Sequence, residues 1–191
     1  MVGRSQTSSL DPWRWPVTVA QIPDSGLDVT LETTPAQREA LAKVARLPEI
    51  SSVGASFRLS HATGGKVHVV GRVTARVGQT CVVTLEPIEN VIDERVDLEF
   101  APEDDIPRLA AIIDAEDDAG EVPDLPEPIS NGTIDLGRVA TDVLFLAIDP
   151  YPRKPGAVFT QPQATRDSDE HPFAALKALQ RGGKPRGSSD D

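Results

Sequence analysis

Residues 53–77, VGASFRLSHATGGKVHVVGRVTARV, decide the fold. Apolar residues occupy alternate positions in two runs separated by a short polar loop with two glycines, 61–65. The alternating residues are Val53, Ala55, Phe57 and Leu59, then Val67, Val69, Val73, Ala75 and Val77. Because successive side chains of a strand point to opposite faces, this spacing predicts an antiparallel hairpin with one buried face.

Further strands are predicted around this hairpin. Alternation places strands at 15–19 and 27–31, joined by a turn at 23–26. After Gly78 we expect a strand at 80–85 and another at 92–100. The predicted sheet is an antiparallel β meander or a small barrel-like sheet.

Two to three helices are expected to pack with this sheet. Thr34, Pro35 and Gln37 form a capping-box pattern that opens a helix over Pro35–Leu47. Asp135 can cap a second helix with a broad apolar stripe, which Asp149-Pro150 ends. A short amphipathic helix is predicted at 172–181. The predicted class is therefore α+β.

The chain is expected to contain one domain with flexible ends. Residues 1–12 form a flexible N-terminus, 13–159 a single α+β domain, and 160–191 a mobile tail. Within the domain, residues 101–128 are rich in acidic residues and proline, which predicts a partly ordered acidic loop. A short helix is expected only at its start, over 106–113.

The net charge of −11 is unevenly distributed over the 191 residues. Between Glu86 and Glu127 there are 16 acidic residues and two arginines, whereas the rest of the chain holds 14 acidic and 17 basic residues. This segregation is typical of an interaction protein, because basic flanks can meet phosphates while the acidic middle repels them.

Cysteine and histidine usage argues against metal or cofactor chemistry. The lone Cys81 excludes an intramolecular disulfide, and we expect it to be an inert thiol buried in a strand. His61, His68 and His171 lack metal-ligand spacing, so no metal and no cofactor are expected. No stretch is long enough to span a membrane and residues 1–11 lack a signal-peptide core, so we expect a cytoplasmic protein.

Three arginines and one histidine are predicted to share the solvent face of the sheet: Arg58, His68, Arg72 and Arg76. They fit either an ordinary solvated face or an electropositive platform for phosphates.

A second basic feature follows the second predicted helix. In YPRKP, residues 151–155, two prolines restrict the backbone and present Arg153 and Lys154, and Tyr151 can stack on a base. A stiff connector after a helix explains the same residues, and both interpretations stay open.

Several ordered stretches together resemble the YceD family, the large ribosomal RNA subunit accumulation proteins. They are Trp15-Pro16-Val17, the strand over 67–76 that leads to QTCVVTLEP at 79–87, the acidic stretch, IDLG at 134–137, LAIDPYPRKPGA at 146–157 and PFAAL at 172–176. The resemblance implies a bacterial factor needed for 23S ribosomal RNA accumulation and large-subunit assembly, with no established enzymatic activity. Relatives often carry CxxC where Cys81 to Thr84 stands, so any metal held by such a pair is expected to be absent here.

Three functions follow as expectations. The first is a noncatalytic ribosome-biogenesis factor that binds ribosomal RNA or a precursor particle through the cations and Tyr151 named above. The second is an acidic escort for a basic ribosomal protein, and a hydrolase that uses His68 with a carboxylate is the weakest. The escort would use Glu103, Asp104, Asp105, Asp114, Glu116, Asp117 and Asp118. Neither a membrane partner nor a particular oligomeric state is predicted.

Overall fold

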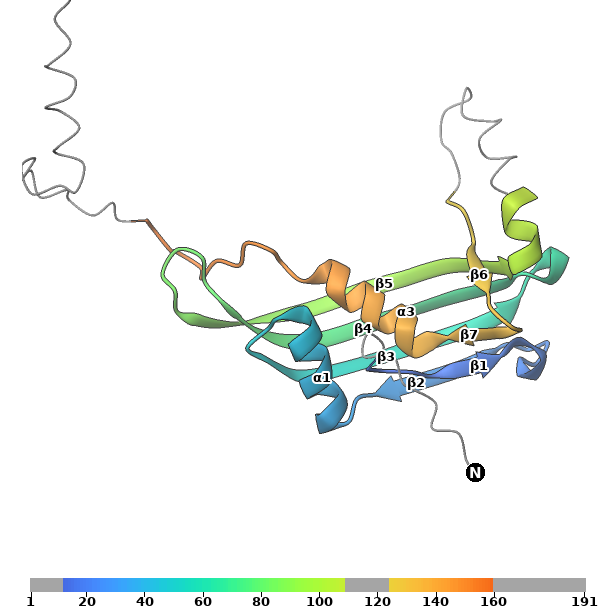
Figure 1. Ribbon diagram of the computed structural model, residues 1–191, viewed down its shortest axis with the longest axis horizontal. Coiled ribbons are helices and arrows are strands. Elements are labelled where there is room, and N and C mark those ends of the chain that lie inside the picture. Colours follow the sequence, from blue (N-terminus) through green and yellow to red (C-terminus); the bar gives the residue numbers. More distant parts are fainter. Residues whose placement is uncertain (1–11, 109–123, 160–191) are drawn as a thin grey trace, which may run out of the picture. The chain divides into compact units, whose positions relative to one another are not determined.

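The computed structural model describes residues 12–108 and 124–159, of which 12–157 belong to one compact unit. Its main element is a five-stranded sheet in the order β2-β3-β4-β5-β6 (Figure 1). The strands are β2 (Leu27–Glu32), β3 (Glu49–His61), β4 (Val67–Thr80), β5 (Pro87–Pro102) and β6 (Glu127–Ile129). The first four form an antiparallel meander, and β6 pairs in parallel with only the last three residues of β5.

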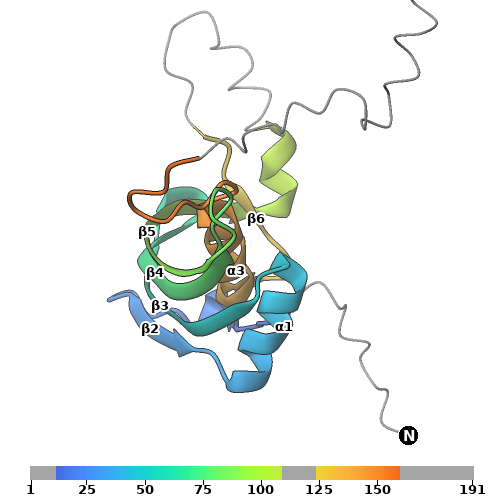
Figure 2. The same cartoon turned by 90° about the vertical axis from the view of Figure 1, so that its left-hand side faces the viewer.

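The remaining elements are a small sheet and two α-helices. Strands β1 (Pro16–Thr18) and β7 (Thr133–Asp135) pair with each other, and β7 leads directly into α3 (Leu136–Ala147). Helix α1 (Pro35–Ala45) joins β2 to β3, and Figure 2 shows the sheet curling with α3 on its concave side. Short 3₁₀ turns lie at Val19–Gln21 (η1), Thr63–Gly65 (η2) and Glu103–Asp105 (η3).

The strand register buries the alternating residues that the sequence identified. Leu59 lies opposite Val69 and Ala55 opposite Val73, and all four side chains are buried against the helices. The polar residues between them point to the opposite, solvent-facing side of the sheet. The pattern of two apolar runs in one phase is therefore what sets the register, because a shift by one residue would expose the whole core face.

The predicted α+β class is confirmed. Of the two sheet forms left open, the meander is observed, and the strands that the structure describes do not close into a barrel. Helix α1 begins with the predicted capping box: Thr34 Oγ1 accepts from the Gln37 amide at 3.3 Å, and Gln37 Oε1 accepts from the Thr34 amide at 2.9 Å. Asp135 caps α3, as predicted.

The predicted pairing at the N-terminus is wrong. The strands expected at 15–19 and 27–31 do form, but β1 pairs with β7, and β2 pairs with β3 instead. The physical reason is the start of α3: the Leu136 amide donates to the Trp15 carbonyl at 3.0 Å, and Asp135 accepts from the Trp15 amide at 2.7 Å. These bonds hold the N-terminal segment beside β7, away from β2.

The strand predicted at 80–85 is also wrong. Strand β4 ends at Thr80, and residues 81–86 form the loop that connects it to β5. The amides of Val82 and Thr84 are engaged outside the sheet, donating to the Pro152 carbonyl and to the Cys81 sulfur. An apolar run alone could not reveal these partners.

Some expectations fall outside the described residues. These are the predictions for residues 1–11 of the N-terminus, for residues 109–123 of the acidic loop and for the tail, including the helix predicted at 172–181. At the start of the loop, residues 106–108 are helical, as predicted. In the part of the chain that the structure describes, no helix is long and apolar enough to cross a membrane.

Candidate functional site

Two segments far apart in sequence meet at one end of the sheet, and we call them together the tip. They are the β4–β5 loop, 81–86, and the segment that follows α3, 149–157. The Val82 amide donates to the Pro152 carbonyl at 2.9 Å, and the Gln79 side chain donates to the Asp149 carbonyl at 2.7 Å. Pro152 itself is buried. The Tyr-Pro-Arg-Lys-Pro segment is therefore anchored to the sheet and not a free connector.

The sulfur of Cys81 connects the two segments of the tip. It is buried and accepts two backbone hydrogen bonds, from the Lys154 amide at 3.3 Å and the Thr84 amide at 3.4 Å. The Lys154 amide, with further bonds from Thr84 and Val83, lowers the pKa of Cys81 to about 6. Burial is thus as predicted, but Cys81 lies in a loop and not in a strand, and its pKa is lowered.

The two cations of the tip differ in their surroundings. Lys154 Nζ pairs with Glu86 Oε2 at 2.9 Å, and this partner holds the pKa of Glu86 below its usual value. Arg153 is exposed and makes no hydrogen bond or ion pair with the described residues. It is therefore the tip cation that a phosphate can approach without displacing a carboxylate.

The tip also exposes large apolar side chains. Leu85 is 76% exposed, Tyr151 71% and Val82 45%. Leu85 has a φ of +61°, a left-handed conformation that is unusual for a residue with a side chain. The conformation is held by a hydrogen bond that the Leu85 amide donates to the Cys81 carbonyl. The backbone thus holds an apolar side chain in solvent at the tip.

The predicted cations of the sheet share its outer, solvent-facing side, here called the outer face. Each one is paired with a carboxylate from a neighbouring strand. Arg58 bonds Asp28 at 2.7 Å, His68 bonds Asp97 at 2.7 Å, Arg72 bonds Asp93, and Arg76 bonds Glu89 at 2.9 Å. Basic and acidic side chains therefore alternate across the outer face in pairs, and the role of this face in RNA binding stays a prediction.

The hydrolase interpretation required a histidine and a carboxylate placed together in a hollow. His68 and Asp97 are so placed, and they border an open hollow with Glu99, Leu125 and Glu127. The groups that line it and could act as a nucleophile or as a general base are His68 and the carboxylates of the hollow. Among the described residues, no group of three or more histidine, cysteine or carboxylate side chains could hold a metal.

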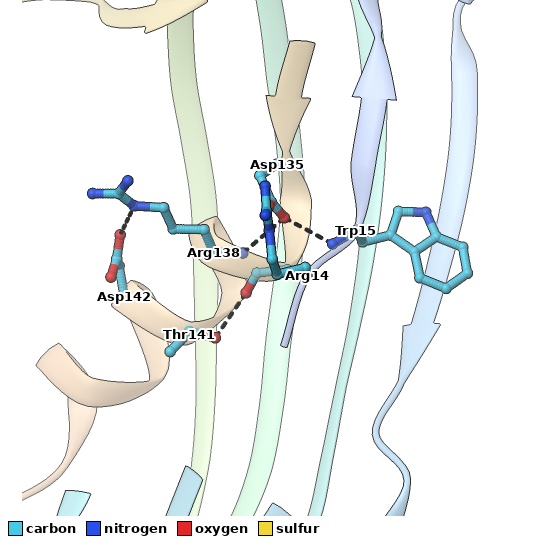
Figure 3. Close-up of polar contacts among 7 residues, drawn as sticks. Arg14, Trp15, Asp135, Arg138, Thr141 and Asp142 are labelled. Carbon is cyan, nitrogen blue, oxygen red and sulfur yellow. Dashed lines mark hydrogen bonds and ion pairs between the residues drawn. The ribbon is translucent and has the colours of Figure 1, made fainter. Parts of the chain in front are cut away.

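Asp135 organises the other end of α3, as Figure 3 shows. Its carboxylate accepts from the Trp15 amide at 2.7 Å, from Arg14 Nε at 3.0 Å and from the Arg138 amide at 3.3 Å. Gly137 is required beside it, because a Cβ there would lie 2.5 Å from the Trp13 carbonyl oxygen. This cluster holds the N-terminal segment against the start of α3 and therefore serves the fold.

The acidic segment is only partly described. Glu103, Asp104 and Asp105 form the 3₁₀ turn η3 directly after β5. The other residues predicted to meet a basic partner, Asp114, Glu116, Asp117 and Asp118, lie outside the described residues.

Sequence reasoning identified Tyr151, Arg153 and Lys154 but missed the other half of the tip. Val82, Leu85 and Cys81 were assigned to a strand because they form part of an apolar run. The signal that could have found the loop is Pro87, which has no amide to contribute to a strand ladder and marks where β5 begins.

The comparisons with known proteins give one match. The model of the family described as "Large ribosomal RNA subunit accumulation protein YceD" matches residues 69–180. The matched range includes β5, α3 and the tip. None of the curated proteins and none of the solved structures matches the chain.

Proposed function

Because the chain belongs to the YceD family of large ribosomal RNA subunit accumulation proteins, we propose that it is a noncatalytic factor of large-subunit assembly that contacts ribosomal RNA through the tip. The observation that carries the proposal is that one segment presents both an exposed Tyr151 and an Arg153 without an ion-pair partner among the described residues. The Pro152 carbonyl, which accepts from Val82, anchors this segment. The proposed factor acts in the bacterial cytoplasm, where precursor ribosomal RNA and ribosomal proteins are assembled into subunits.

The chemistry of the tip favours unpaired RNA. An exposed tyrosine ring gives a base a stacking surface, but only a base that has left its helix can reach it. Stacking contributes roughly 1–3 kcal/mol per base and Arg153 adds a phosphate contact. Leu85 and Val82 add exposed apolar surface to the tip. A loop or bulge of ribosomal RNA meets these requirements better than a duplex.

The outer face is the weaker candidate for the same role. A phosphate that binds Arg72 or Arg76 must compete with Asp93 or Glu89, which already neutralise the guanidinium groups. Arg58 and His68 face the same competition. These four residues remain part of the proposal as secondary contacts, with a smaller expected effect on RNA affinity.

A gel mobility-shift titration of the purified protein with fragments of precursor 23S RNA tests the proposal. The double variant Tyr151→Ala/Arg153→Gln is expected to weaken binding by tenfold or more, since it removes one stacking contact and one phosphate contact. The matched control is Arg72→Gln/Arg76→Gln on the outer face, which is expected to change affinity less than threefold. Equal loss in both variants would move the RNA contact to the outer face.

The acidic escort remains a second candidate, favoured by the concentration of 16 acidic residues between Glu86 and Glu127. Deleting Glu103 to Asp124 separates the two functions. If the deletion abolishes binding of a basic ribosomal protein and leaves RNA binding intact, the acidic segment is the escort surface. If neither partner is affected, the escort function is wrong.

A further inference from the structure

Strand β5 has an open edge along most of its length. Among the strands that the structure describes, only β6 pairs with its outer side, and β6 covers Phe100–Pro102. Figure 1 shows β5 along one margin of the sheet, beside β4. Unpaired strand edges of this length are templates for another strand, and proteins normally shorten or cover them.

The strand register identifies the backbone groups that face outward. The Cys81 amide donates to the Glu86 carbonyl, and the next pair, Thr80 with Pro87, involves a residue without an amide hydrogen. Bonded and non-bonded pairs alternate in an antiparallel ladder. Even-numbered residues of β5 therefore bond to β4, and the amides of Glu89, Val91, Asp93 and Arg95 point to the open side.

An apolar groove lies next to this edge. Its wall is a stripe on α3 at positions i, i+4 and i+7, formed by Val139, Val143 and Leu146, and Leu98 and Phe100 of β5 also line it. The groove has a volume of about 680 Å³, and Leu146 is 87% exposed. Val139 and Val143 are partly buried against the core, whereas Leu146 at the end of the stripe is left in solvent, where an apolar helix residue normally packs against another element.

We propose that the open edge of β5 and the groove together bind an extended basic segment of a partner protein as an added strand. A strand that pairs with β5 satisfies the outward amides and carbonyls. Because its side chains alternate, every second one points toward the α3 stripe. One ligand thus satisfies two features that nothing else in the described structure explains.

The charges around the edge select a basic partner. Strand β5 carries five carboxylates and one arginine. Four of the carboxylates are paired within the outer face, whereas Glu94 is exposed and makes no hydrogen bond or ion pair with the described residues. Glu127, at the rim of the groove, is likewise unpaired. Lysine or arginine side chains on the added strand would meet these two groups.

The same charges disfavour the other occupants. Pairing of two β5 edges from two copies of the chain would bring their carboxylates together, and like charges directly opposite destabilise a sheet. RNA would meet a negative rim with no unpaired cation on β5 except Arg95. The proposed partner is therefore distinct from the RNA that the tip is proposed to bind, and it does not depend on that proposal.

The test uses the full chain and a synthetic, fluorescein-labelled peptide of about eight residues, a typical strand length, in which lysine and valine alternate. A peptide that alternates glutamate and valine is the matched probe. We expect binding of the first peptide only. In amide exchange measured by NMR, we expect new protection at Val91, Asp93 and Arg95, with no change at Ile92, which is already bonded to β4. Protection of the odd-numbered amides before peptide is added, or binding without this alternation, would overturn the proposal.

Two variants weaken the two halves of the site separately. Val91→Pro removes one outward amide while leaving the bonds to β4 in place, and Leu146→Gln removes an exposed apolar side chain from α3 without touching the core. Each is expected to weaken peptide binding about tenfold. Leu85→Gln changes another largely exposed leucine, at the tip, and is the control that should leave peptide affinity unchanged. Unchanged affinity in Leu146→Gln would remove the groove from the site and contradict the proposal.

Discussion

At the scale of single residues, Cys81 combines two properties that rarely occur together. Its sulfur is fully buried, but amide hydrogen bonds from Lys154 and Thr84 stabilise the thiolate and lower its pKa to about 6. We expect thiolate absorbance near 240 nm to appear around pH 6 in the native protein and to be missing in Cys81→Ala. Alkylation by iodoacetamide should nevertheless be slow until the protein is unfolded, because reagent cannot reach the sulfur.

The same shift predicts a pH dependence of stability. The pKa of Cys81 is lower in the folded chain than in the unfolded one, so between about pH 6 and pH 9 the unfolded state binds more protons. The free energy of unfolding should therefore rise with pH in this window for the wild-type protein relative to Cys81→Ala. Urea denaturation of both proteins at several pH values measures the difference, in which other titrating groups cancel. A difference that stays constant with pH would contradict the folded-state pKa.

Gly71 is a second residue whose role is local. A Cβ at this position would lie 2.3 Å from the Ser56 carbonyl oxygen and 2.5 Å from a ring carbon of Phe57. We expect Gly71→Ala to destabilise the protein by about 1–3 kcal/mol, because the buried ring must move. Gly54→Ala is the matched control on the adjacent strand, where the nearest atom would be 3.6 Å away. Similar losses in both variants, measured by urea unfolding, would rule out the steric explanation.

At the scale of elements, the junction of β7 with α3 should contribute to stability out of proportion to its size. Asp135→Ala removes a helix cap together with the acceptor for the Trp15 amide, so a loss of about 2 kcal/mol is expected. Asp142→Ala breaks only an exposed pair with Arg138 at 3.7 Å and should cost about 0.5 kcal/mol or less. Amide exchange should also speed up at Trp15 in the first variant alone. Undisturbed exchange at Trp15 would show that β1 is held by other contacts.

Elements whose cause is local were predictable from the sequence. The capping box of Thr34 and Gln37 defines the start of α1 by itself, and alternation in β3 and β4 fixes both their faces and their pairing. The pairing of β1 was not predictable, because it depends on Asp135, which lies 120 residues away from Trp15. The loop at 81–86 was not predictable for the same reason, since the Val82 amide donates its hydrogen bond to the distant Pro152 carbonyl.

At the scale of the whole molecule, the charge pattern of the sequence differs from the charge pattern of the surface. Alternation correctly places Arg72 and Arg76 on the outer face, but only the register of β4 against β5 brings Asp93 and Glu89 within reach of them. The basic platform and the acidic segment, which look separate along the chain, therefore partly neutralise each other in the fold. Arg153 has no carboxylate partner among the described residues, because it lies beyond the sheet, at the tip.

This distribution predicts how RNA affinity depends on salt. For single strands, the slope of log K against log salt is about −0.7 per neutralised phosphate, so contact through Arg153 alone gives roughly −0.7. Participation of Arg58, Arg72 and Arg76 would raise the count to four and the slope to roughly −2.8. Titrations of precursor 23S fragments at several salt concentrations measure this number directly. We expect the shallow slope, a slope close to zero in Arg153→Gln, and weaker binding with an unchanged slope in Tyr151→Ala, because stacking releases no counterions. A steep slope that falls in Arg72→Gln would instead show that RNA displaces the carboxylates of β5 and binds the outer face.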